Sequence, residues 1–144
     1  MEQKYTANVS IVINATSAKI WEALTKPEVV KQYMFGTDME ADWKVGGQIK
    51  YKGVWEGKPY EDKGTVLEIQ PEKLLISSYF SPLSGMEDKP ENYSIIKYEI
   101  TPEAVGSKLT LTQTNLDKEE TAKYMEGNWQ KVLDSMKKIL ETTV

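Results

Sequence analysis

A chain of 144 residues with 40% hydrophobic and 28% charged residues is long enough for one globular domain with a sizeable core. It contains no cysteine and no histidine, and all of its basic residues are lysines. These absences exclude disulfides, thiolate nucleophiles, imidazole bases, His- or Cys-ligated zinc and bidentate arginine contacts. The net charge of −4 weighs against nucleic acid or an anionic membrane as the main partner.

No apolar run approaches the roughly 20 residues that a membrane-spanning helix requires. The segment Met1–Lys4 lacks the apolar core of a secretory signal. The chain has neither an internal repeat nor an interior linker. We therefore expect one cytoplasmic domain covering residues 1–144.

The first forty residues predict a strand followed by two short helices. Residues Tyr5–Ile13 alternate between apolar and polar side chains, which indicates a strand with one buried face. Capping residues then precede the segment Ser17–Leu24, which has apolar residues at helical spacing. Pro27 fits the first turn of a second short helix. The residues that this helix turns inward are Val29, Val30, Tyr33 and Met34.

After Gly36 the pattern changes to strands. We expect six more of them, at Asp38–Lys44, Gln48–Trp55, Tyr60–Gln70, Leu74–Phe80, Tyr93–Thr101 and Lys108–Asn115. The connections between consecutive strands are mostly short, so the sheet should be antiparallel. The segment Ser81–Asn92 shows no periodicity and is long for a hairpin loop, a property often linked to function.

The C-terminal segment Asp117–Glu141 is predicted to be a long amphipathic helix. Asp117 and Glu120 have the spacing of a capping box. The apolar stripe of this helix contains Met125, Trp129, Val132, Leu133, Met136, Ile139 and Leu140. The sheet face that should pack against it carries Ile49, Tyr51, Trp55, Ile96, Tyr98, Ile100, Leu109 and Leu111. The expected fold is α+β, with six to seven antiparallel strands curved around one helix.

Several short motifs occur in a fixed order along the chain. They comprise Trp21, Leu24, Thr25, Pro27 and Glu28, then Val45, Gly46 and Gly47, then Gly64, Val66 and Glu68, and finally Gly127, Trp129, Leu133, Met136, Leu140 and Glu141. In this order they resemble the AHSA-like family, homologues of the C-terminal domain of the activator of the heat-shock protein 90 ATPase. That family belongs to the SRPBCC superfamily, with the START and birch-pollen-allergen domains.

The resemblance covers essentially the whole chain and implies a helix-grip fold. The eukaryotic activator has a separate N-terminal chaperone-binding domain with no counterpart in this sequence. Family members with known roles include ligand carriers, cyclases and stress-linked proteins, so the resemblance does not choose an activity.

A set of mostly aromatic residues is the candidate ligand site. Tyr51, Trp55, Tyr79, Tyr98, Met125 and Trp129 either line an apolar cavity between sheet and helix or fill a solid core. Gln113 either binds the polar end of a ligand or reaches solvent. Gly127 either leaves room for a ligand or a close strand, or it makes a tight packing contact or marks a late helix start, and we favour packing. Its cost in a helix is about 1 kcal/mol relative to alanine.

Strand alternation predicts where a cavity would open. The connections Glu56–Pro59, Ser81–Asn92 and Asn115–Asp117 should lie at one end of the sheet, next to the start of the terminal helix. We therefore expect the mouth at the N-terminus of that helix.

Three functions follow as hypotheses. The leading one is a binding module for a small apolar or amphipathic ligand, a monomer or weak dimer without catalytic residues, metal or organic cofactor. The second is a protein-interaction or chaperone-accessory role using the loop Ser81–Asn92, in line with the stress-linked relatives. The third is a cyclase, isomerase or hydrolase using Tyr and Glu in the cavity. Glu61, Asp62 and Glu68 are the candidate acid–base carboxylates, of which Glu61 and Asp62 follow a turn and should be solvated.

Overall fold

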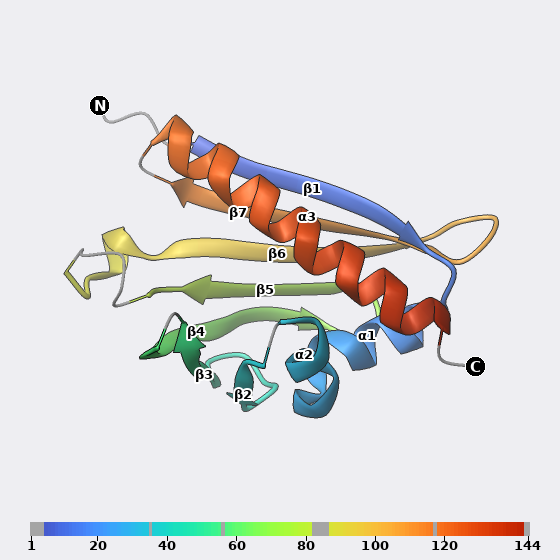
Figure 1. The fold of residues 1–144 in the computed structure, drawn as a ribbon, viewed down its shortest axis with the longest axis horizontal. Helices are drawn as coiled ribbons and strands as arrows, with labels where there is room; N and C mark the ends of the chain where they lie inside the picture. Colours follow the sequence, from blue (N-terminus) through green and yellow to red (C-terminus); the bar gives the residue numbers. More distant parts are fainter. Residues whose placement is uncertain (1–4, 35, 56, 82–86, 117, 143–144) are drawn as a thin grey trace.

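The computed structural model describes residues 5–34, 36–55, 57–81, 87–116 and 118–142, with the side chains of Trp55 and Thr142 left aside (Figure 1). The elements in chain order are β1 (Tyr5–Ile13), α1 (Ser17–Thr25), α2 (Pro27–Tyr33), β2 (Asp38–Ala41), β3 (Gln48–Trp55), β4 (Lys58–Gln70), β5 (Leu74–Tyr79), the short 3₁₀ helix η2 (Pro90–Asn92), β6 (Ser94–Pro102), β7 (Ser107–Leu116) and α3 (Glu119–Thr142).

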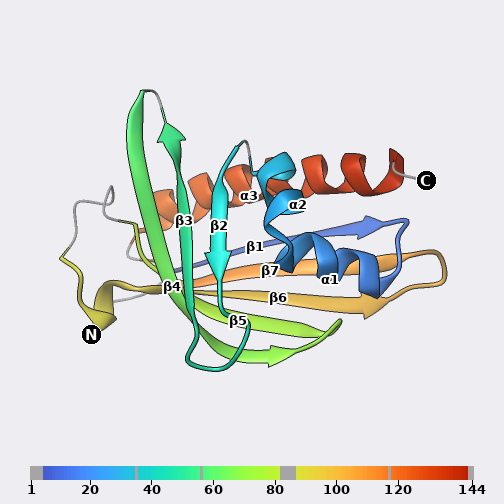
Figure 2. The same ribbon diagram turned by 90° about the horizontal axis from the view of Figure 1, so that it is seen from below.

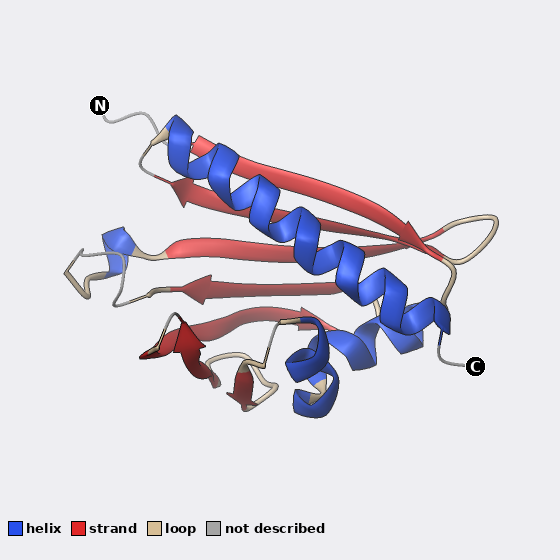
Figure 3. Ribbon diagram, in the orientation of Figure 1, coloured by secondary structure: helices blue, strands red, loops and turns tan. Residues whose placement is uncertain are grey.

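The strands form one antiparallel sheet in the order β1-β7-β6-β5-β4-β3-β2. Helix α3 lies diagonally across one face of this sheet, while α1 and α2 close the end near the C-terminus (Figures 1 and 3). The predicted α+β fold, with a curved sheet around a long helix and two short helices after the first strand, is confirmed.

The spacing of apolar residues along α3, β6 and β7 explains which side chains form the core. Trp129, Leu133 and Met136 lie on one face of α3 and are buried. They pack with the sheet residues of the same apolar cluster, including Tyr98 and Leu111. Along β6 and β7 buried and half-buried residues alternate, as the sequence pattern predicts.

A bend in β4 gives the sheet its curvature. The register between β4 and β5 shifts between Val66 and Glu68, which marks a bulge. A Cβ at Gly64 would lie 1.9 Å from the carbonyl oxygen of Ser78, so only glycine allows the two strands to approach this closely. As Figure 2 shows, the hairpin of β3 and β4 therefore projects to the side of the sheet on which α3 lies.

Side chains of α3 cover the outer edge of β1. Glu126 accepts a hydrogen bond from the backbone N–H of Asn8 at 3.0 Å, and Lys137 donates to the carbonyl of Val12 at 2.9 Å. Glu141 accepts from the N–H of Asn14 at 2.8 Å. These contacts occupy backbone groups that would otherwise form an exposed edge.

Several predicted bounds differ from the structure. Strand β2 ends at Ala41 rather than Lys44, because the chain turns there: the N–H of Lys44 bonds to the carbonyl of Asp42, and Gly46 has a φ of 87°. Strand β4 begins at Lys58, two residues before the predicted start. The predicted capping residue Asp117 lies outside the described residues.

The predicted long loop contains η2 near its end, and its described part is held in place. Lys63 forms an ion pair with Asp88, and the hydroxyl of Tyr93 donates to the same carboxylate. The amide of Asn115 donates to the carbonyls of Glu91 and Tyr93. The part of this loop at residues 82–86 lies outside the described residues.

Candidate functional site

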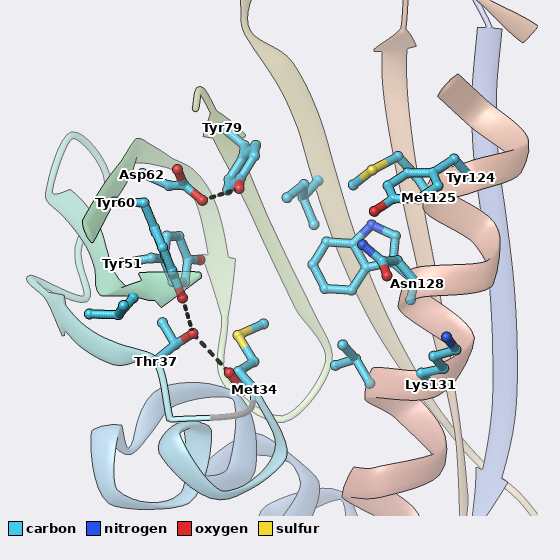
Figure 4. A pocket seen from close by; sticks show the side chains of 14 residues that line it. Met34, Thr37, Tyr51, Tyr60, Asp62, Tyr79, Tyr124, Met125, Asn128 and Lys131 are labelled. Atoms are coloured by element: carbon cyan, nitrogen blue, oxygen red, sulfur yellow. Dashed lines mark hydrogen bonds between the residues drawn. The ribbon is translucent and has the colours of Figure 1, made fainter. Parts of the chain in front are cut away.

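A cavity of about 540 Å³ lies between the projecting β3–β4 hairpin and α3 (Figure 4). Its lining residues are Met34, Thr37, Tyr51, Val54, Tyr60, Asp62, Tyr79, Ile96, Tyr124, Met125, Asn128, Trp129, Lys131 and Val132. Most of these side chains are apolar or aromatic. A volume of this size accommodates a small organic molecule.

Asp62 on β4 is the carboxylate of the cavity. The hydroxyl of Tyr79 on β5 donates a hydrogen bond to its Oδ2 (Figure 4). The other oxygen, Oδ1, is enclosed and receives no hydrogen bond from the residues that the structure describes. An enclosed carboxylate oxygen without a donor is unfavourable, which makes it a candidate contact for a ligand.

Tyr51 faces Asp62 across the β3–β4 pair, in direct register. Its ring centroid lies 6.0 Å from that of Tyr79, with the planes tilted by 56°. Burial, with the negative charge of Asp62 as a smaller cause, raises the pKa of Tyr51 and of Tyr79 well above the ordinary value. Both phenols therefore stay protonated at neutral pH and do not act as bases.

Tyr60 is positioned by a glycine and a threonine. A Cβ at Gly53 would lie 2.5 Å from the Tyr60 hydroxyl oxygen, so the ring occupies the space that the glycine leaves. Thr37 donates to the carbonyl of Met34 at 2.8 Å. Since a threonine hydroxyl has one proton, the Tyr60 hydroxyl donates to Thr37 Oγ1, at 2.6 Å. These contacts join the hairpin to the end of α2.

The opening of the cavity lies along the N-terminal half of α3. Among the lining residues, Val54 and Tyr124 are 68% and 65% exposed, and Asn128 and Lys131 are also exposed. Figure 4 shows Tyr124, Asn128 and Lys131 on successive turns of α3, opposite the hairpin. The sequence placed the mouth at the end of the helix, whereas these residues place it along the side.

The structure brings four of the predicted site residues together and places three others elsewhere. Tyr51, Tyr79, Met125 and Trp129 line the cavity, and the side chain of Trp55 lies outside the described part of the chain. Tyr98 is buried beneath the cavity wall, with its ring edge-on to Trp129 at 6.5 Å between centroids.

Gln113 is a buried structural residue that does not line the cavity. It is 3% exposed, donates to Ser94 Oγ at 2.9 Å and accepts from Trp129 Nε1 at 2.8 Å. The interpretation that its strand reaches solvent here is wrong, because β7 continues to Leu116 under α3.

The interpretations of Gly127 as space for a ligand and as a packing contact are both wrong. The helix does not start late either, because α3 begins at Glu119. A Cβ built there would meet nothing within 4 Å, and the residue is exposed. It lies neither against a packing neighbour nor against the cavity. Trp129 is two residues further on, which is about 200° around the helix and therefore on the opposite face.

Sequence reasoning missed the role of Asp62, which was expected to be solvated. Because β4 begins at Lys58, Asp62 is well inside the strand and is half-buried. The alternation of Tyr60, Asp62 and Gly64 opposite Tyr51 was the available signal, since residues two apart share a face. Thr37 and Asn128 carried no pattern that singled them out.

Two further findings concern the described residues alone. No group of three or more acidic residues there could hold a metal ion. No helix in that part of the chain has the length and apolar character to cross a membrane.

Together, the sheet curved around its C-terminal helix and the cavity between them define a helix-grip α+β domain. The family described as "Activator of Hsp90 ATPase homolog 1-like protein" matches residues 14–141, and the chain belongs to this family. The resemblance drawn from the sequence motifs is thus confirmed. No curated protein matches the sequence significantly.

Solved structures agree with this assignment. The chain is 48% identical to ChR145 from Cytophaga hutchinsonii, with a TM-score of 0.85, covering 98% of this chain and 97% of that one. An Aha1 dimer from Colwellia psychrerythraea is 21% identical, with a TM-score of 0.76 and coverages of 96% and 97%. CalU16 from Micromonospora echinospora is 17% identical, with a TM-score of 0.73 and coverages of 97% and 86%. The last two likenesses concern the fold alone.

Proposed function

We propose that the protein binds a small amphipathic molecule in the cavity between the β3–β4 hairpin and α3. The observation that carries this proposal is the combination of an apolar cavity of about 540 Å³ with an enclosed carboxylate oxygen that has no hydrogen-bond partner among the described residues. Ligand sites are typically apolar concavities with a few fixed polar groups.

The two parts of the cavity have different roles. Met34, Ile96 and Val132 offer apolar contact area on three separate elements, which suits the hydrophobic part of a ligand. Asp62 lies on the hairpin side and gives that ligand one orientation. The cavity is open alongside α3, so a ligand enters without unfolding the domain.

Phenylnaphthylamine, a neutral apolar dye whose fluorescence rises in an apolar environment, tests the proposal. We expect a saturable increase at one dye per chain in the wild-type protein. Val132→Trp should abolish it, because the larger side chain fills the cavity from α3. Gly127→Leu is the matched control on the same helix: its side chain projects to the exposed face and should leave binding unchanged.

Two results would contradict the proposal. One is the absence of saturable binding of any apolar probe by the folded wild-type protein. The other is equal binding by wild type and a folded Val132→Trp variant, since the dye would then lie elsewhere.

A further inference from the structure

Resting on the proposed binding function, we propose that the ligand is an organic ammonium compound whose positively charged amine binds Asp62. The apolar part of such a ligand would lie against α3 and the sheet.

The charge of Asp62 has no cationic partner among the described residues. Lys63, its neighbour, pairs with Asp88. Lys52 pairs with Glu40 and Glu61. An enclosed carboxylate oxygen without a partner is destabilising, and a cation that brings its own hydrogen-bond donors offsets that penalty.

Among the lining residues that the structure describes, Lys131 is the one cation, and it lies away from Asp62. Figure 4 shows it on α3, on the opposite side of the cavity from the carboxylate. It is exposed, so its charge is hydrated at the rim. The negative end of the cavity is therefore available to a ligand.

Aromatic side chains surround Asp62 in the cavity. Tyr51, Tyr60 and Tyr79 lie beside the carboxylate on β3, β4 and β5 (Figure 4). Trp129 on α3 lines the same cavity. The faces of aromatic rings attract organic cations, and rings combined with a carboxylate are a recurrent way to bind ammonium groups.

The hydroxyl groups of the tyrosines around Asp62 also favour a positively charged ligand. Because the pKa values of Tyr51 and Tyr79 are raised by burial and then by Asp62, these phenols stay neutral. Tyr79 uses its proton on Asp62 Oδ2, which leaves Oδ1 to accept from a ligand. An anionic ligand would meet Asp62 at the same place and be repelled.

The hydroxyl group of an uncharged ligand would also donate to Oδ1 of Asp62. The decisive experiment therefore compares ligands that share one alkyl tail and differ only in the head group. Calorimetric titration at pH 7 would use hexylamine, hexanol and hexanoate. An aliphatic amine, with a pKa of about 10, is charged there. We expect hexylamine to bind about tenfold or more tightly than hexanol, and hexanoate more weakly than hexanol.

Asp62→Asn should bring the affinity for hexylamine to within about threefold of that for hexanol, with the affinity for hexanol unchanged. Glu61→Gln is the matched control, because it removes the same charge from the adjacent residue, whose side chain pairs with Lys52. It should keep the preference for the amine. If Asp62→Asn does not fold, Asp62→Leu removes the charge without leaving a polar group, and the wild-type series still decides.

Equal affinities of hexylamine and hexanol for the wild type would overturn the ammonium inference and leave the proposed function intact. An amine preference that survives in a folded Asp62→Asn variant would overturn it in the same way. Failure of all three compounds and of the apolar dye to bind would remove both proposals.

Discussion

The indole Nε1 of Trp129 donates a hydrogen bond to the amide oxygen of Gln113 at 2.8 Å, in the middle of the core. The amide nitrogen of Gln113 in turn donates a hydrogen bond to Ser94 Oγ. Two residues that the sequence suggested as ligand contacts thus fix α3 to β6 and β7. Only the cavity-facing side of Trp129 is left for a ligand.

Trp129→Ala should reduce the free energy of unfolding by about 3–5 kcal/mol, the usual cost of deleting a core aromatic. Trp129→Phe keeps most of the apolar contact but leaves Gln113 Oε1 without its donor, which should cost about 1–3 kcal/mol. Guanidinium unfolding measures both values. Tyr124→Ala, an exposed change on the same helix, should alter stability by less than about 0.5 kcal/mol. A Trp129→Phe variant as stable as wild type would contradict the structural role of this hydrogen bond.

The contact of Glu141 with Asn14 predicts a pH dependence. The hydrogen bond from the backbone of Asn14, followed by Lys137, lowers the pKa of Glu141 below its ordinary value of 4.5. A lowered pKa in the folded state means that the stabilisation is present above pH 4.5 and is lost as the pH falls through the folded-state pKa. The melting temperature of wild type should therefore exceed that of Glu141→Gln at pH 7.

The difference in melting temperature between wild type and Glu141→Gln should shrink as the pH falls from 4.5 to the folded-state pKa of Glu141, and it should vanish below that pKa. Glu119→Gln, an exposed change at the other end of the helix, is the control for a general charge effect. A difference between wild type and Glu141→Gln that persists at pH 2 would contradict the assignment.

The buried tyrosines predict alkaline unfolding. Burial raises the pKa of Tyr33, Tyr51, Tyr79 and Tyr98, four of the eight tyrosines, above the ordinary value of 10. A raised folded-state pKa means that their contribution to stability is fully present below pH 10 and is lost as the pH rises beyond it.

Phenolate absorbance and circular dichroism, followed together against pH, measure this effect. The absorbance of these four residues should appear only when the native circular dichroism is lost. In concentrated urea, by contrast, all eight should ionise near pH 10. Complete ionisation with the native circular dichroism retained would show that the four hydroxyls are accessible.

The sequence predicted the fold well because periodicity and turn residues act locally. Strand β3 was placed at its observed bounds, and the buried stripe of α3 followed from its spacing. The register of the β3–β4 hairpin, which sets Asp62 opposite Tyr51, depends on where the turn begins. A two-residue difference in that start turned an expected solvated carboxylate into a half-buried one.

The remaining misses concern the direction in which side chains point in three dimensions. Gln113 continued an apolar face toward the expected mouth, but the added length of β7 kept it inside. The bend of β4, which moves the hairpin toward α3, lies at the bulge between Val66 and Glu68 and is accompanied by the close approach of Gly64 to the backbone of Ser78 on the neighbouring strand. No pattern within β4 alone specifies it.

Replacing either of two glycines by alanine should change the free energy of unfolding in opposite directions. Gly127 lies in an exposed helix position where a Cβ would meet nothing within 4 Å, so Gly127→Ala should raise the free energy of unfolding by about 0.5–1 kcal/mol. Gly64→Ala would place a Cβ 1.9 Å from a backbone oxygen that cannot move without shifting β5, and should lower stability by about 1–3 kcal/mol or more. Urea unfolding of both variants, with dye binding measured in parallel, checks these signs. Because Gly64 allows β4 to approach β5 at the base of the hairpin, Gly64→Ala should also weaken binding, whereas Gly127→Ala should leave it unchanged. A stabilising Gly64→Ala substitution would mean that β4 does not require this close approach.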